Sequence, residues 1–350
     1  MAVLPGPPTR DLHGAKRALT PSQNNSNGER LNMDSRDFGG LGRVSVLTLG
    51  GGGIGQVWGP TSREESVATL SRAVDAGINL IDLAPSYGQG EAETVFGQAF
   101  GGSVPAGVRL TTKCRLDNLP ANQVFSVLEQ SLKDSLDRMK VERVDLFFLH
   151  SQIVPDDSID RYDGTSREIF VNAVVPAFER LVSDGRIGAW AITGIGIPSA
   201  VLETIQADPH PAAVQAIANL LDSPGAIKRY DEAAIPREII ATAHQRGMGV
   251  MGIRAVQAGA LTSSLDRELA DDHPEARDFR RAVPFRSLAA ELGESPASLA
   301  HRYALSIDGI STVVLGVKNR KELAECVAAE AKGRLEPELM ARIDAAVGRS

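Results

Sequence analysis

The 350-residue sequence predicts a single-domain (β/α)8 barrel, a TIM barrel of the α/β class. Three observations carry this prediction: eight short apolar runs, helical patterns between them, and no strict polar alternation within the runs. Such runs suit strands that a filled barrel interior covers on one face and helices cover on the other. Eight strand–helix repeats spread over about 300 residues favour the barrel, and a doubly wound parallel sheet is the alternative.

The eight apolar runs are expected to be the barrel strands. In chain order they are Val44–Leu49, Asn79–Leu83, Arg109–Thr112, Val144–Leu149, Ala189–Thr193, Ala213–Ile217, Gly249–Ile253 and Ser311–Leu315.

Helical patterns separate these runs. Ser62 is expected to begin the first helix and Asp75–Gly77 to end it. In a later segment, the apolar residues recur at helical spacing and predict an amphipathic helix. This stripe consists of Val124, Val127, Leu128, Leu132 and Leu136.

Residues 1–40 differ in composition from the rest and predict a poorly ordered N-terminal tail, followed by the barrel over residues 41–350. The first part is rich in Pro, Asn, Ser and Gly and has no apolar periodicity. Met33 directly precedes the ordered pattern, so we treat it as a candidate start of the native protein.

Composition excludes several classes of partner. The net charge of -7 and the pI near 5.5 argue against nucleic acid, which needs a clustered basic surface. No apolar run reaches the ~20 residues that span a bilayer, so no membrane partner is expected. Prolines at positions 5, 7 and 8 stand where a secretory signal would be apolar, which predicts a cytoplasmic protein. The two cysteines form neither a disulfide framework nor a metal-type spacing, so no metal site is expected.

The stretch Leu49–Gly59 contains the spacing Gly50-x-Gly52-x-x-Gly55 of a dinucleotide-binding fingerprint. A Rossmann turn passes directly into a helix, but here Gly59-Pro60 interrupts any helix before Ser62. We therefore interpret these glycines as a low β–α loop that lets a ligand lie close to the backbone.

Four polar side chains follow successive predicted strands. Asp82 ends the second strand, Tyr87 lies in the loop after it, Lys113 ends the third, and His150 follows the fourth. In a barrel these strand ends face one mouth, where active sites are found. A Lys at a strand end needs a partner, and Asp82 on the neighbouring strand supplies one.

These four groups suit proton transfer to a carbonyl oxygen. A neighbouring ammonium is expected to lower the pKa of Tyr87 from its usual value of about 10. Tyr87 then acts as general acid or base, while His150 positions the substrate oxygen or assists the movement of the proton. None of the four supplies an electron pair, which implies a hydride carrier.

The chain resembles the aldo-keto reductases over roughly residues 36–345. The motifs GINLIDLAPSYGQGEAETVFGQAF, LTTKC, VDLFFLH and VVLGVKNRKELAEC carry this resemblance. It implies that Asp82, Tyr87, Lys113 and His150 match the catalytic tetrad of that family, with Tyr87 as the acid. It also implies a nicotinamide cofactor that lies extended across the barrel mouth without a Rossmann fold.

The resemblance further implies a set of cofactor contacts. The first turn of the helix after the eighth strand offers backbone N–H groups with Lys318, Arg320 and Lys321, which fit an adenosine phosphate, so NADP is the favoured cofactor and NAD the alternative. The family's usual Gly-x-Ser-Asn motif and its stacking aromatic are both missing here. Glu322 and Cys326 also depart from the pattern of NADP-dependent members, and Glu322 would repel a 2′-phosphate that it faced. The implied contacts are Gly51, Gly52, Gly53, Asp82, Gln215, Arg254, Gly316, Lys318, Arg320 and Glu325.

The substrate is expected to be a small aldehyde, ketone or aldose. Trp58, Tyr87 and His150 are the predicted substrate contacts, together with the long loops after His150 and Ala255. Three alternatives remain: an NAD-dependent aldose 1-dehydrogenase, a non-catalytic regulatory subunit like those of some ion channels, and a Schiff-base aldolase using Lys113. The charge that Asp82 keeps on Lys113 argues against the aldolase.

Overall fold

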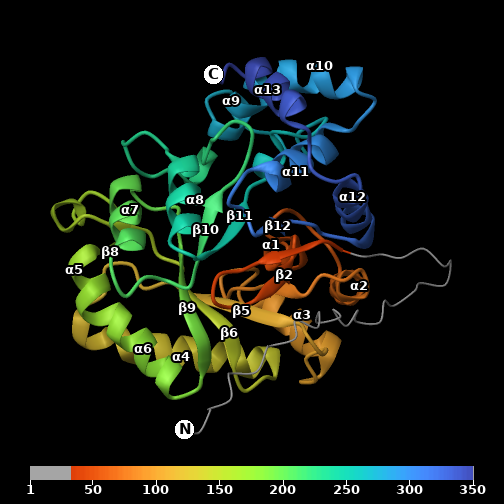
Figure 1. Ribbon diagram of the computed structural model, residues 1–350. Helices are drawn as coiled ribbons and strands as arrows, with labels where there is room; N and C mark the ends of the chain where they lie inside the picture. Colours follow the sequence, from red (N-terminus) through yellow and green to blue (C-terminus); the bar gives the residue numbers. More distant parts are fainter. Residues whose placement is uncertain (1–32, 350) are drawn as a thin grey trace, which may run out of the picture. The chain divides into compact units, whose positions relative to one another are not determined.

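A closed barrel of eight parallel strands forms the centre of the molecule (Figure 1). The structure, a computed structural model, describes residues 33–349. Because β12 pairs with β3, the sheet leaves no open edge. Round the barrel the strands are β3 (Leu47–Gly50), β4 (Leu80–Asp82), β5 (Arg109–Cys114), β6 (Val144–Leu149), β9 (Ile187–Thr193), β10 (Ala213–Ile217), β11 (Gly249–Ile253) and β12 (Thr312–Leu315). Each predicted run overlaps one barrel strand, which confirms the fold class.

The amino-terminal end of the barrel carries a hairpin that the sequence did not predict. β1 (Ser35–Asp37) pairs antiparallel with β2 (Arg43–Ser45), so the first predicted run divides into β2 and β3. Phe38 at the turn of this hairpin is fully buried. The expected tail is therefore wrong for residues 33–40, which are folded, while residues 1–32 lie outside the described part of the chain.

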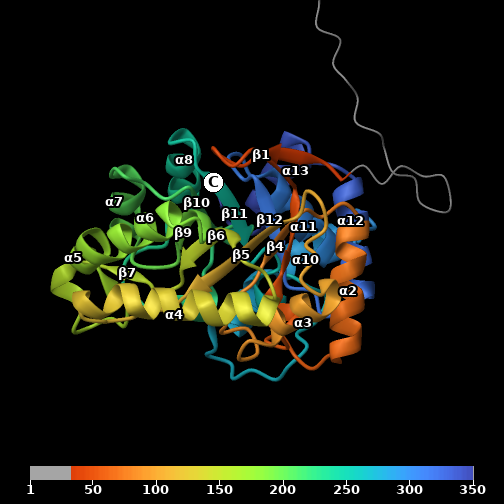
Figure 2. The same cartoon turned by 90° about the horizontal axis from the view of Figure 1, so that it is seen from below.

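Helices cover the outside of the barrel (Figures 1 and 2). Three helices are additional to the alternation of strand and helix. They are α9 and α10, within the connection from β11 to β12, and α13 near the carboxyl end. A further pair of two-residue strands, β7 (Ile153–Val154) and β8 (Thr165–Ser166), lies in the loop after β6. The helices are α1 (Gly51–Ile54), α2 (Arg63–Asp75), α3 (Glu91–Phe100), α4 (Ala121–Met139), α5 (Arg167–Ile169), a π-helix (Phe170–Val174), α6 (Val175–Ser183), α7 (Pro198–Gln206), α8 (Pro236–Gln245), α9 (Pro274–Arg281), α10 (Val283–Glu291), α11 (Pro296–Ser306), α12 (Arg320–Ala331) and α13 (Pro337–Ala346).

Local sequence explains how helices α2 and α4 form. Ser62 caps α2, since its hydroxyl accepts a hydrogen bond of 3.1 Å from the backbone N–H of Glu65. Four of the five apolar residues predicted for α4 are buried, and Val127 lies half-buried at the edge of the stripe. Both helix predictions are confirmed.

The apolar core has two layers. Inside the barrel, Leu80, Leu146, Phe148 and Met251 form one buried cluster with Phe38. Gly249 at the start of β11 makes room for the Phe38 ring, because an added Cβ there would lie 2.6 Å from it. A larger apolar layer joins the outer face of the strands to the helices. The interior is thus filled at its amino end, which leaves the carboxyl ends of the strands for a site.

Candidate active site

The four predicted ionisable residues lie at the carboxyl ends of three strands that are consecutive round the barrel. Asp82 ends β4, Lys113 is the penultimate residue of β5, and His150 directly follows β6. Tyr87 lies in the loop between β4 and α3. The structure therefore brings the four residues to one end of the barrel.

The ammonium of Lys113 holds this group together. Its Nζ donates hydrogen bonds of 2.8 Å to Asp82 Oδ2, 2.9 Å to the carbonyl oxygen of Leu83 and 3.2 Å to the Tyr87 hydroxyl. Lys113 is 0% exposed and Asp82 is 1% exposed. A buried charge persists only with such partners, so Asp82 fixes both the charge and the position of Lys113.

Thr111 supports the ion pair, and the sequence reasoning missed it. Its hydroxyl donates a hydrogen bond of 2.7 Å to Asp82 Oδ1, the oxygen that Lys113 does not bind. Thr111 pairs with Asp82 in the register of β4 and β5 and precedes Lys113 by two residues. Since side chains two apart on a strand share a face, strand periodicity was the signal that would have found it.

The rings of Tyr87 and His150 stand perpendicular to each other, with centroids 5.9 Å apart. Burial raises the pKa of Tyr87 above its ordinary value, although the charge of Lys113 acts in the opposite direction. The expectation that Lys113 would lower the pKa of Tyr87 overall is therefore wrong. Asp82 contributes to this result, since its carboxylate also opposes a phenolate.

His150 is a neutral imidazole across the working range of pH. Burial, with the nearby charges of Lys113 and Arg115, lowers the pKa of His150 to about 3. A neutral ring has one N–H donor and one acceptor nitrogen, which suits a contact with a carbonyl oxygen.

The depressed pKa of His150 predicts a loss of stability in mild acid. Between pH 6.5 and about 3, His150 is protonated in the unfolded chain but stays neutral in the folded protein. The free energy of unfolding therefore falls as the pH falls. From pH 7.5 to 5.0 we expect wild type to lose about 1–2 kcal/mol more than His150→Gln. Urea unfolding at both pH values measures this, and equal losses in the two proteins would contradict it.

The glycines after β3 are required by packing within the chain. An added Cβ at Gly53 would lie 1.9 Å from the carbonyl oxygen of Val317, and one at Gly51 would lie 3.0 Å from the ring of Tyr87. The backbone of the β3 loop thus packs directly on the loop after β12. Contact of Gly51, Gly52 and Gly53 with a ligand stays a prediction.

This packing predicts a large effect of a single methyl group. Gly53→Ala is expected to lower the free energy of unfolding by about 1–3 kcal/mol, because the carbonyl of Val317 must move. Gly40→Ala is the matched control, since a Cβ at Gly40 meets nothing within 4 Å. Chemical denaturation compares the two variants, and equal stabilities would contradict the packing argument.

Gln215 carries an unsatisfied polar atom that fits a cofactor amide. It lies on β10, is 3% exposed, and its Nε2 has no hydrogen-bond partner among the described residues. Such a buried donor suits the oxygen of a nicotinamide carboxamide. Arg254, another predicted cofactor contact, pairs with Glu275, with Nη2 donating a hydrogen bond of 2.5 Å to Oε1. A network that includes Gln257 therefore engages Arg254, and the sequence did not predict it.

Trp58 lies between two segments predicted for the cofactor. Its indole Nε1 is 2.8 Å from where a Cβ of Gly52 would be and 3.1 Å from that of Gly316. The side chain is therefore placed over the loops after β3 and β12 and remains exposed.

The remaining predicted cofactor residues follow β12. Gly316 and Lys318 lie in the loop, Arg320 is the first residue of α12, and Glu325 is exposed on the same helix. Cys326 points away from this surface, since it is buried with its Sγ 3.7 Å from His301 Nε2.

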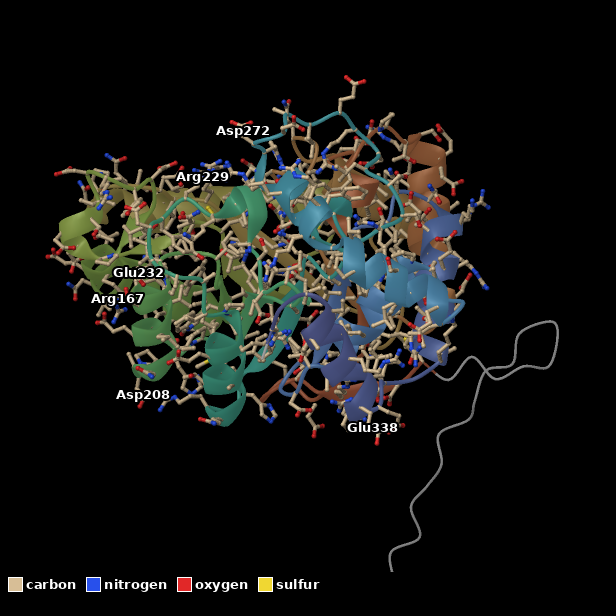
Figure 3. The ribbon with its side chains drawn as sticks, turned by 90° about the horizontal axis from the view of Figure 1, so that it is seen from above. Arg167, Asp208, Arg229, Glu232, Asp272 and Glu338 are labelled. Carbon is tan, nitrogen blue, oxygen red and sulfur yellow. The ribbon has the colours of Figure 1, made fainter. Side chains whose placement is uncertain are left out.

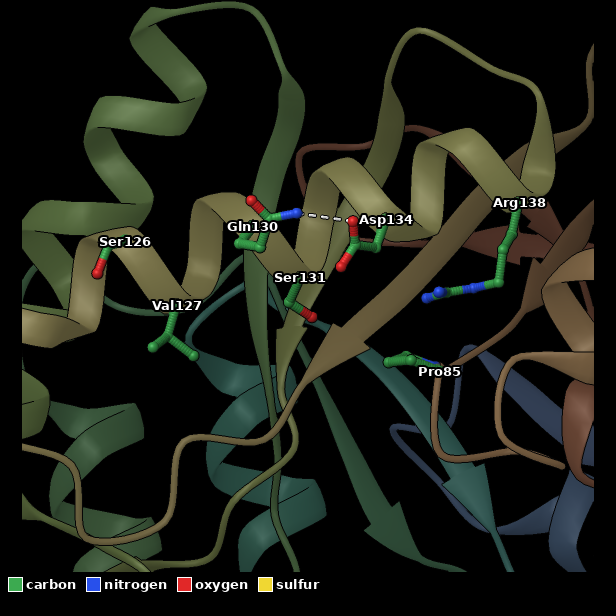
Figure 4. Close-up of a pocket in the computed structure, with 7 residues that line it drawn as sticks. All are labelled: Pro85, Ser126, Val127, Gln130, Ser131, Asp134 and Arg138. Carbon is green, nitrogen blue, oxygen red and sulfur yellow. Dashed lines mark hydrogen bonds between the residues drawn. The ribbon is translucent and has the colours of Figure 1, made fainter.

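Figure 3 shows Arg229 and Asp272, in loops that follow strands, at one end of the barrel and Asp208, which precedes β10, at the other. A pocket on the outside is lined by Pro85 and six residues of α4, among them Arg138, and by none of the four ionisable residues (Figure 4).

Within residues 33–349, no three His, Cys, Asp or Glu side chains are grouped to hold a metal. No helix in that range is long and apolar enough to cross a membrane.

A family model described as "Aldo/keto reductase family" matches residues 46–347. Among curated proteins, the chain is 25% identical over 300 residues to the L-galactose dehydrogenase of Arabidopsis thaliana, covering 85% of this chain and 88% of that protein. It is also 25% identical over 243 residues to the "NADH-specific methylglyoxal reductase" of Escherichia coli, covering 65% and 68%.

Among solved structures, an aldo/keto reductase from Klebsiella pneumoniae in complex with NADP and acetate is similar, with a TM-score of 0.65 and 22% identity. The similarity covers 90% of this chain and 96% of that one. The likeness supports the barrel fold, and the NADP belongs to that protein.

Proposed function

Because the chain belongs to the aldo/keto reductase family, we propose that it is an NAD(P)-dependent oxidoreductase acting on a small aldehyde, ketone or aldose. Tyr87 is the general acid in reduction and the general base in oxidation. The observation that carries this proposal is the contact of 3.2 Å between Lys113 Nζ and the Tyr87 hydroxyl, with Asp82 holding Lys113 on its other side.

The residues act by moving one proton and stabilising one charge. In reduction, Tyr87 gives its hydroxyl proton to the substrate oxygen, and the phenolate that remains lies beside the ammonium of Lys113. The raised pKa of Tyr87 keeps the proton on the phenol until that transfer. The neutral ring of His150 orients the same oxygen through a hydrogen bond. When bound, the nicotinamide supplies the hydride in reduction and takes it in oxidation.

A nicotinamide dinucleotide fits the polar groups at the mouth. The unpartnered Nε2 of Gln215 would bind the carboxamide, and the loops after β3 and β12 would carry the rest of the molecule. The sequence favours NADP with NAD as the alternative, and the relatives' names point both ways, to NADP in one and to NADH in another.

The names of the relatives also support the substrate class. An L-galactose dehydrogenase and a methylglyoxal reductase act on a sugar and a small carbonyl compound. The first of these names favours one second candidate, an aldose 1-dehydrogenase that works in the oxidative direction. A Schiff-base mechanism is disfavoured, because Asp82 and Tyr87 raise the pKa of Lys113 despite its burial and thereby keep its amine protonated.

The test is a panel of small aldehydes, ketones and aldoses with reduced and oxidised cofactors, followed at 340 nm. Turnover of at least one substrate pair supports the proposal. Cofactor binding without turnover of any member would instead favour the regulatory subunit.

A further inference from the structure

Two carboxylates bind the chain where α12 begins, the segment predicted to meet the adenosine phosphate. Glu65 on α2 accepts hydrogen bonds from Arg320: 2.9 Å from the backbone N–H, 3.1 Å from Nε and 2.8 Å from Nη2. Helices α2 and α12 lie side by side (Figures 1 and 2). Glu65 thus binds both the side chain and the backbone of Arg320.

Lys318 is engaged in the same way. Its backbone N–H donates 2.8 Å to Glu322 Oε2, and its Nζ lies 3.3 Å from Asp266 Oδ2 and 3.7 Å from Glu322 Oε1. Two of the segment's three cations, Lys318 and Arg320, are therefore engaged by the carboxylates of Glu65, Asp266 and Glu322, while Lys321 is exposed.

These contacts decide which ligand the segment accepts. A phosphate needs free N–H donors and an excess of positive charge, and here the chain's own carboxylates bind the donors. Ribose hydroxyls are neutral and donate hydrogen bonds, so they tolerate nearby carboxylates. The Arg320 contacts lower the pKa of Glu65 to about 2, which keeps its carboxylate charged at any working pH.

We propose that this chain selects NAD over NADP, with Glu65 and Glu322 excluding the 2′-phosphate. This inference rests on the proposed function, because it concerns the adenosine end of the same cofactor. The sequence alone favours NADP because of the charges of Lys318 and Arg320, and this inference reverses that preference. The sequence does not show that Glu65 on α2 binds Arg320 on α12.

Binding measurements on the full-length protein test the inference. Isothermal titration calorimetry gives the dissociation constants of NADH and NADPH, and of the fragments 5′-AMP and 2′,5′-ADP, at one fixed salt concentration. Wild type is expected to bind NADH at least ~10-fold more tightly than NADPH. In Glu65→Gln combined with Glu322→Gln, NADPH affinity should rise at least ~10-fold, while NADH affinity changes less than ~3-fold.

Glu64→Gln is the matched control. Glu64 precedes Glu65 in the first turn of α2 and makes no contact with Lys318 or Arg320, so its removal should leave both affinities unchanged. The inference is overturned if wild type binds NADPH as tightly as NADH, or if the double variant keeps the cofactor preference of wild type. Either result leaves the proposed function standing. Absence of binding of both cofactors overturns the proposed function and the inference together.

Discussion

Tyr87→Phe is expected to lower kcat at least ~10²-fold, a larger effect on activity than any other single substitution should have. The substitution removes the hydroxyl that donates to the substrate oxygen and keeps the ring that packs against Gly51 and His150. Cofactor affinity should therefore stay within a few-fold of wild type. Steady-state kinetics with a turned-over substrate, together with cofactor titration, measure both quantities.

The control for this change is Tyr230→Phe, which removes a second phenolic hydroxyl from a loop outside the tetrad. Its kcat is expected to remain near that of wild type. Full turnover by Tyr87→Phe would remove Tyr87 from its assigned role. A loss of cofactor binding equal to the loss of turnover would make its role structural.

Breaking the buried ion pair on one side only is expected to have the largest effect on stability. Asp82→Asn leaves the ammonium of Lys113 buried without its carboxylate, and Lys113→Met leaves that carboxylate with only Thr111 as a side-chain donor. Each change should lower the free energy of unfolding by about 3–5 kcal/mol. The double variant should lose at least about 2 kcal/mol less than the sum, because neither charge then remains.

Denaturant unfolding of the two single variants and the double variant gives this coupling energy. Asp137→Asn and Lys133→Met provide the matched exposed pair, with side chains 65% and 59% exposed and a contact of 2.7 Å. Their coupling should be below about 1 kcal/mol, as for other surface pairs. Additive losses at Asp82 and Lys113 would show that the two buried charges do not depend on each other.

The barrel and its strand ends were predictable because both depend on local patterns. β6, β10 and β11 have the predicted bounds, since each is a short and mostly apolar run between clear helix signals. The hairpin of β1 and β2 was missed because its strands have three residues each, too few for a periodic signal. Its place is fixed by Phe38, whose burial depends on a glycine more than 200 residues away.

In the candidate site, too, the residues that depend on local patterns were predictable and the contacts between distant segments were not. Asp82, Lys113 and His150 were found because strand ends of a barrel converge whatever the loops do. The contacts of Arg254 with Glu275 and of Arg320 with Glu65 join segments 21 and 255 residues apart, and no local pattern pairs them. The direction of the Tyr87 pKa was missed for a related reason, since desolvation depends on how the whole mouth is packed.

Phe38 and the strand side chains around it close the amino-terminal end of the barrel interior. Access to the Tyr87 hydroxyl is therefore from the carboxyl ends of the strands. A cofactor and a substrate bound as proposed would therefore both enter at the end opposite the hairpin of β1 and β2.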